Sequence, residues 1–217
     1  SPRICDEEDM NDKKPEHENQ ENADTDAGKT AAQIPIMPIA DGVLFPKMVI
    51  PIVVTQDEYM DMIDEVMADK RMIGLVTTRQ QERKETYGAS DLHEIGTSAL
   101  ILKMAKSEDK KIHLMLQGLF RFNIKEIVRT EPYIEGRFEE IPEKNEKDTE
   151  IEGLMANIAK IFQEIVQLSP AIPNELGGMA TTIEEPETLA DMIASTINCT
   201  VQEKQTVLET LDIKKRL

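Results

Sequence analysis

The stretch Thr97–Gln117, TSALILKMAKSEDKKIHLMLQ, decides the fold of this chain. Its first half is mainly apolar up to Met104. Its second half sets Ile112, Leu114 and Leu116 against His113, Met115 and Gln117. This period of two is typical of a strand with one buried face, and the polar residues Ser107–Lys110 between the halves are typical of a turn. The stretch therefore predicts a β-hairpin.

Strand patterns extend from this hairpin in both directions. Phe120–Ile127 continues it, and another strand is expected from Tyr133. Upstream, Met72–Thr77 indicates a buried strand and Val43–Val54 indicates short extended segments broken by proline. Ile34–Ile39 alternates apolar residues with prolines, which predicts an edge strand whose prolines face away from the ladder. Over Ile95–Ile141 the pattern predicts an antiparallel meander or a small barrel.

One helix is expected inside this β-rich part. Thr55 is followed three residues later by Glu58, which is the pattern of a capping box. Apolar residues then recur at helical spacing to about Ala68. The charged stretch Arg79–Asp91, which follows the next predicted strand, is expected to be an exposed loop.

The hydrophobic pattern changes from a strand period to a helix period after the charged linker Pro142–Asp148. Apolar residues at steps of three and four predict a helix over Ile151–Leu168, ended by Ser169-Pro170. Further along, a short segment spans Asn174–Ala180, Pro186 would open a helix, Thr200 and Glu203 repeat the capping box, and Asp212 is typical of a cap. We expect that last helix to be interrupted by the end of the sequence.

These patterns divide the chain into three parts. Residues 1–33 are polar and acidic, which predicts a disordered tail because they cannot bury enough apolar surface. A β-rich domain over 34–142 and a helical domain over 148–217 follow. The expected fold class is therefore α+β.

Composition narrows the possible partners and location. The 217 residues carry a formal net charge of −17, which opposes binding to a phosphate backbone, so nucleic acid is not expected as a partner. No apolar run reaches the roughly 20 residues of a membrane span, so no membrane partner is expected. Cys5 and Cys199 do not form a disulfide framework, which favours a reducing, cytoplasmic location.

No catalytic or metal-binding pattern stands out in the sequence. The serines lack the local signature of a nucleophile paired with a lysine. His17, His93 and His113 have no ligand-type spacing to either cysteine. We therefore predict that this chain has no catalytic residue, no metal site and no cofactor of its own.

Methionine is abundant, with 12 residues in the chain. Met60, Met62 and Met67 lie together on the first predicted helix, whose apolar arc is roughly 160° wide at about 100° per residue. One interpretation is core packing. The alternative is a soft surface that adapts to exposed apolar segments of other proteins, which would make Met60, Met62 and Met67 substrate-binding residues.

Several short phrases stand out by their order along the chain. In the β-rich part they are Ile34–Ile39, Leu44–Pro51, Glu94–Thr97 and Gln117–Arg121. In the helical part they are Pro173, Glu185-Pro186, Leu189–Asp191, Ile193-Ala194, Glu203–Gln205, Leu208-Glu209, Asp212-Ile213 and Arg216-Leu217. From about Gln33 to Leu217 the chain resembles the N-terminal domain of Lon, the ATP-dependent protease. Ala40 stands where that family usually has arginine, so no contact of that arginine is carried over.

The resemblance implies a PUA-like β-barrel subdomain followed by an α-helical bundle subdomain. It also implies that the full-length protein is a homo-oligomer. Its ATPase module, which uses ATP and Mg, and its peptidase with a Ser/Lys dyad would both lie outside this chain.

The leading functional hypothesis is a substrate-recognition and assembly domain of an ATP-dependent serine protease. That protease would degrade misfolded and regulatory proteins, and this domain would capture unfolded or degron-bearing substrates. The alternative is a stand-alone PUA-like ligand-binding module. A free-standing enzyme would require a catalytic constellation that the sequence does not display.

Overall fold

A computed structural model describes residues 32–217 of the chain. The predicted disordered tail over 1–33, with His17 and Cys5, lies outside the described residues except for its last two positions. Gln33 already belongs to the first strand. By their contacts, residues 31–217 form one compact unit, so the proposed division at 142–148 into two domains stays a prediction.

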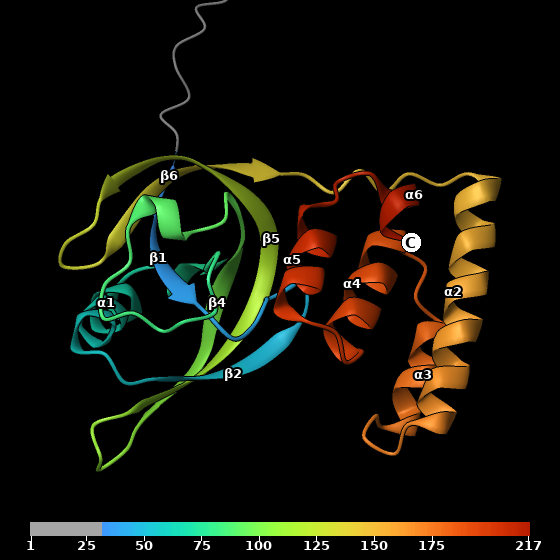
Figure 1. Ribbon diagram of the computed structural model, residues 1–217, viewed down its shortest axis with the longest axis horizontal. Helices are drawn as coiled ribbons and strands as arrows, with labels where there is room; N and C mark the ends of the chain where they lie inside the picture. Colours follow the sequence, from blue (N-terminus) through green and yellow to red (C-terminus); the bar gives the residue numbers. More distant parts are fainter. Residues whose placement is uncertain (1–31) are drawn as a thin grey trace, which may run out of the picture. The chain divides into compact units, whose positions relative to one another are not determined.

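A six-stranded sheet forms the first half of the described chain (Figure 1). Its strands are β1 (Gln33–Ile39), β2 (Val49–Val54), β3 (Met72–Thr77), β4 (Ile95–Lys106), β5 (Ile112–Arg129) and β6 (Ile134–Ile141). They lie in the order β2-β5-β4-β3-β1-β6, and β6 also pairs with β5. The last strand in this order, β6, therefore pairs with β5, the second strand in the order. The predicted hairpin is confirmed, since Ile112 of β5 pairs with Lys106 of β4.

The antiparallel pairing expected over Ile95–Ile141 is confirmed for β4, β5 and β6, whereas β1 and β3 are parallel. Parallel neighbours need a crossover connection, and β2 together with helix α1 (Asp57–Ala68) supplies it. The sequence marked each of these elements but did not show which strands would become neighbours.

The prediction that Ile34–Ile39 is an edge strand is wrong, because β1 lies between β3 and β6. The two neighbours cover different halves of β1. Residues Gln33–Ile36 pair with β6, and Ile36–Ile39 pair with β3. Pro35 and Pro38 therefore each lie where β1 is paired on one side only, and a proline is tolerated on an unpaired side.

Helix α1 packs on the sheet through one face. Tyr59, Met62, Ile63 and Val66 are buried there, in a core shared with the inward side chains of the strands. The predicted capping box does not form, because the N-cap is Gln56 and no side chain caps the helix. The Gln56 side chain instead donates to the carbonyl oxygens of Lys84 and Glu85.

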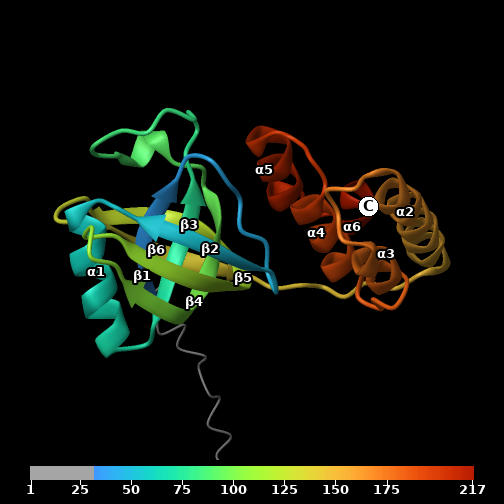
Figure 2. The same ribbon diagram turned by 90° about the horizontal axis from the view of Figure 1, so that it is seen from below.

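Helices follow β6, and Figures 1 and 2 show them on the side of the sheet opposite α1. They are α2 (Thr149–Leu168), α3 (Asn174–Ala180), α4 (Pro186–Thr196), α5 (Val201–Glu209) and α6 (Ile213–Arg216). The predicted starts of the last three are confirmed. Pro186 lies in the first turn of α4, Thr200 and Glu203 form a capping box, and Asp212 caps α6. Among residues 32–217, no helix combines the length and apolarity needed to cross a membrane.

The start of α2 is capped by Asp148, whose carboxylate accepts a hydrogen bond of 2.8 Å from the Ile151 backbone N–H. Lys214 of α6 forms an ion pair of 2.8 Å with the same carboxylate. The bond from Lys214, with that from Ile151, holds the pKa of Asp148 below its ordinary value.

We expect the Asp148 carboxyl to titrate below the normal aspartate range in a pH titration followed by carbon NMR. A lowered folded-state pKa means that the stabilisation is fully present at neutral pH and is lost as the pH falls through that pKa. Lys214→Met should move the titration upward while the cap remains. An unchanged titration in this variant would contradict a role for Lys214.

Candidate functional site

The three methionines singled out in α1 lie in different environments. Met62 has 0% exposed surface and belongs to the core. Met60 and Met67 are half-buried and pack against the same core. Met62 therefore offers no surface to a bound protein in this conformation. The proposed substrate-binding role of Met60 and Met67 stays a prediction.

A different apolar surface lies on the outward side of β2 and its neighbours. Ile50, Ile52 and Val54 point into the core, which leaves Val49, Pro51 and Val53 outward because side chains alternate along a strand. Val49 is 49% exposed and Val53 is 51% exposed. Pairing places Pro51 opposite Met115 of β5, which is 36% exposed.

A β-bulge in β4 extends this surface. Lys103 pairs with Met115 and Ile101 with Leu116, so Leu102 is an extra residue in the strand, and it is 42% exposed. We call Val49, Pro51, Val53, Leu102 and Met115 the sheet face.

The edge of β2 that faces away from β5 has no strand beside it among the described residues. The Gly118 N–H donates to the Met48 carbonyl, so every second residue from Met48 onward bonds to β5. Val49, Pro51 and Val53 therefore direct their backbone groups toward the free edge. Pro51 has no N–H, but because it faces the free edge no hydrogen bond between β2 and β5 is lost. Its missing N–H also discourages another strand from pairing with this edge.

A groove of about 170 Å³ lies beside this free edge. It is lined by the ends of β1 and β2, by the start of α1, and by Arg83 and Tyr87 of the loop that follows β3. Arg83 pairs with Asp41 at 2.7 Å across it. Pockets for small-molecule ligands usually hold about 300–1,000 Å³, so this groove suits a single side chain better than a metabolite.

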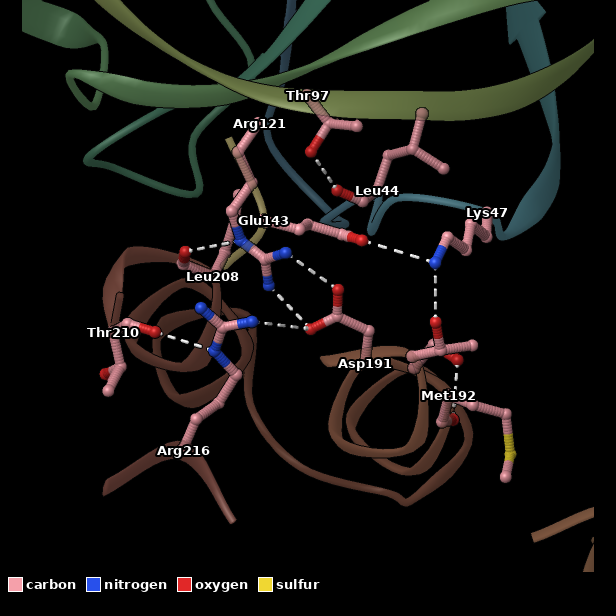
Figure 3. A network of polar contacts seen from close by, with 12 residues as sticks. Leu44, Lys47, Thr97, Arg121, Glu143, Asp191, Met192, Leu208, Thr210 and Arg216 are labelled. Atoms are coloured by element: carbon pink, nitrogen blue, oxygen red, sulfur yellow. Dashed lines mark hydrogen bonds and ion pairs between the residues drawn. The ribbon is translucent and has the colours of Figure 1, made fainter. Parts of the chain in front are cut away.

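A buried polar junction connects the sheet to the helices (Figure 3). Arg121 of β5 donates to both carboxylate oxygens of Asp191 in α4, at 2.8 and 2.5 Å, and to the Leu208 carbonyl at 3.0 Å. The Arg121 and Asp191 side chains are only 3% and 1% exposed. Burial raises the pKa of Asp191, while the Arg121 guanidinium acts in the opposite direction and stabilises the carboxylate.

Arg216 of α6 joins the same junction. Its Nε donates to the Thr210 carbonyl at 2.6 Å, and its Nη1 lies 3.8 Å from the Asp191 carboxylate. Figure 3 also shows Lys47, which donates to Glu143 at 3.2 Å and to Thr188 of α4 at 2.8 Å. The junction thus fixes the relative positions of sheet and helices.

A second contact between sheet and helices involves His93, which is 7% exposed. Its Nδ1 lies 2.8 Å from a Glu209 carboxylate oxygen in α5. Gln205 donates to the same carboxylate oxygen at 2.9 Å and to the Ile95 carbonyl at 3.0 Å. The sequence did not indicate the contacts of His93 with Glu209 and of Gln205 with Ile95, because tertiary structure brings these residues together.

The structure gives no arrangement typical of metal binding in the part of the chain that it describes. No group of three or more His, Cys, Asp or Glu side chains within residues 32–217 could hold a metal ion. His113 lies on the exposed side of β5, and Cys199 is a free thiol.

Comparison with known proteins points to one family. The family model described as the ATP-dependent protease La (LON) substrate-binding domain matches residues 33–217. The chain is 58% identical over 196 residues to a Lon protease of Desulfosudis oleivorans, a match that covers 90% of this chain and 24% of that relative. It is 45% identical over 199 residues to a Lon protease of Syntrophus aciditrophicus, covering 90% and 25%. The chain thus spans about a quarter of the length of these relatives.

Solved structures share the fold. The N-terminal domain of the Mycobacterium avium complex Lon protease superposes with a TM-score of 0.68 at 24% identity, covering 85% of this chain and 94% of that one. A Lon N-terminal domain protein from Xanthomonas campestris gives a TM-score of 0.63 at 16% identity, with the same coverage.

Proposed function

Because the chain belongs to the family of ATP-dependent protease La (LON) substrate-binding domains, we propose that it is the N-terminal substrate-recognition and assembly domain of an ATP-dependent serine protease. Its substrates would be misfolded or regulatory proteins that expose unfolded or degron-bearing segments.

The sheet face is the observation that carries this proposal. An unfolded segment presents apolar side chains that a folded protein hides, and burying one such side chain contributes about 1.5–3 kcal/mol. Val49, Val53, Leu102 and Met115 offer exposed apolar contacts of this kind. Binding at one copy would be weak, and repetition of the domain in a homo-oligomer would strengthen it through avidity.

The proposal extends to the architecture. The β-rich half would be a PUA-like β-barrel, which is supported by the pairing of β6 with both β1 and β5. The half from α2 onward would be a helical bundle. The parent protein would hold ATP and Mg in a separate ATPase module, carry a Ser/Lys dyad in a separate peptidase, and act in the cytoplasm, where a free thiol such as Cys199 stays reduced.

To test substrate recognition, we would measure binding of the 217-residue chain to fluorescent, reduced and carboxymethylated α-lactalbumin by anisotropy. This unfolded probe is itself acidic, so charge attraction cannot account for binding. We expect Val53→Asp to raise the dissociation constant at least about tenfold, equivalent to about 1.4 kcal/mol, because a charge would replace an apolar contact.

Val128→Asp is the matched control. Val128 is 42% exposed on the same strand as Met115 but outside the sheet face, so binding should not change. Equal losses in both variants, or no binding by the unaltered chain, would contradict the proposal. A folded Met60→Asp/Met67→Asp variant with unchanged binding would restrict recognition to the sheet face and exclude the methionines.

A further inference from the structure

Helix α2 carries two apolar stripes. The inward stripe includes Ile151, Ala159, Phe162 and Val166, all buried against the neighbouring helices. This stripe accounts for the packing of α2 in the bundle. Met155 and Ile158 pack partly against the same core, which leaves Ile161, Ile165 and Leu168 exposed.

The second stripe consists of Leu154, Ile158, Ile161, Ile165 and Leu168. Its members follow one another at steps of four, three, four and three, which is the spacing of a helix–helix seam in coiled coils. Ile161, Ile165 and Leu168 are 47%, 40% and 84% exposed. Leu154 and Ile158 are half-buried. We call these five residues the α2 seam.

No described element covers the outer side of α2. In both Figure 1 and Figure 2, α3, α4 and α6 lie on one side of α2, and nothing in residues 32–217 is drawn beyond the other side. Three large aliphatic side chains in successive turns are therefore left to solvent on a well-formed helix. A stripe with this spacing fits another helix rather than an extended segment.

The charges beside the α2 seam complement those of a second, reversed copy. Counting about 100° per residue, Lys160 and Glu164 lie on the same flank of the seam. Both are exposed, and neither makes an ion pair within the described residues. When two copies of α2 run antiparallel with Ile161 facing Ile165, Ile158 faces Leu168 as well. Lys160 of each copy is then only about 3 Å along the axis from Glu164 of the other.

We propose that the α2 seam binds the α2 seam of a second copy of this chain, antiparallel and about a two-fold axis. A two-fold pair forms each contact twice, so Ile161 meets Ile165 of the second copy at two equivalent places. The flanking Lys160 and Glu164 form two ion pairs across the contact. This pairing does not depend on substrate binding, because the sheet face lies on different elements.

The test is sedimentation equilibrium of the 217-residue chain at physiological ionic strength. We expect a reversible dimer. Ile161→Asn should raise its dissociation constant at least about tenfold, because each dimer loses two buried apolar side chains. Met179→Asn is the matched control, since Met179 is 52% exposed on neighbouring α3 outside the seam, and it should leave the dimer unchanged. If Ile161→Asn fails to fold, Leu168→Gln replaces it.

Charge reversal tests the antiparallel arrangement. Lys160→Glu should weaken the dimer about threefold or more, because it places like charges opposite each other twice. Adding Glu164→Lys to that variant should restore the affinity. Any of three results would overturn the proposal. The unaltered chain could stay monomeric up to about 1 mM, or Ile161→Asn could leave the dimer dissociation constant unchanged. The third is a Lys160→Glu/Glu164→Lys dimer that is no tighter than the Lys160→Glu dimer. Anisotropy with the unfolded probe, measured at chain concentrations below the dimer dissociation constant and unchanged in Ile161→Asn, would separate this result from substrate recognition.

Discussion

Replacing Arg121 with methionine is expected to lower the free energy of unfolding by about 3–5 kcal/mol, the usual cost of leaving a buried charge without its partner. Asp191 would keep only the more distant Arg216, at 3.8 Å, and the Leu208 carbonyl would lose its donor. Urea unfolding followed by far-UV circular dichroism measures the difference.

Two controls make this prediction specific. Arg121→Met/Asp191→Leu/Arg216→Met removes all three charges of the junction and should recover most of the loss, because apolar side chains can replace buried ion pairs at little cost. Arg83→Met breaks an exposed pair with Asp41, with side chains 76% and 72% exposed, and should cost less than about 1 kcal/mol. Similar losses for Arg121→Met and Arg83→Met would show that the junction does not hold the sheet and helices together.

Gly118→Ala is the second change expected to have a large effect. An added Cβ would lie 2.2 Å from the Phe45 carbonyl oxygen and 3.0 Å from its carbon. These are backbone atoms, fixed by bonds from the Lys47 N–H to the Gly118 carbonyl at 2.9 Å and from the Gly118 N–H to Met48 at 2.8 Å. We expect a loss of about 3 kcal/mol or more, at the upper end for overpacking.

Gly153 provides the comparison for this substitution. It lies in α2, and a Cβ there would meet nothing within 4 Å. Gly153→Ala should therefore stabilise the protein by about 0.5–1 kcal/mol through the helix preference of alanine. Thermal and urea unfolding of the two variants should change in opposite directions. A Gly118→Ala variant as stable as the unaltered chain would mean that the Phe45–Met48 loop can move away from β5.

The features predicted correctly from the sequence depend on neighbours a few residues apart. The capping box of Thr200 and Glu203, the cap at Asp212 and the first-turn proline of α4 are all local. The capping box expected at Thr55 failed although the same residue types were present, because the chain entered the helix one residue later, at Gln56.

Features that depend on distant pairing were not predicted. The parallel neighbours β1 and β3 are separated along the sequence by β2 and α1. No local pattern of residues shows which strand another strand will pair with. Arg121 and Asp191 are 70 residues apart. Arg121 shares its strand face with Gln117 and Asn123, and Asp191 lies one helical turn from Glu187, so no local pattern marked either residue as buried.

The candidate site was predicted only in part for the same reason. The strand pattern predicted β2, yet which of its faces is outward follows from its register with β5. The methionines of α1 suggested that this helix could bind substrates. However, α1 packs directly on the sheet, so Met62 is enclosed in the core.

The position of Arg216 has a mechanical consequence. Arg216 lies one residue before the last of the sequence, and its guanidinium reaches the carboxylate that also holds Arg121. Tension applied at Leu217 would therefore be transmitted through two arginines and one aspartate to β5. Pulling the chain from this end should load β5, the strand that also bears Met115, before the helices separate.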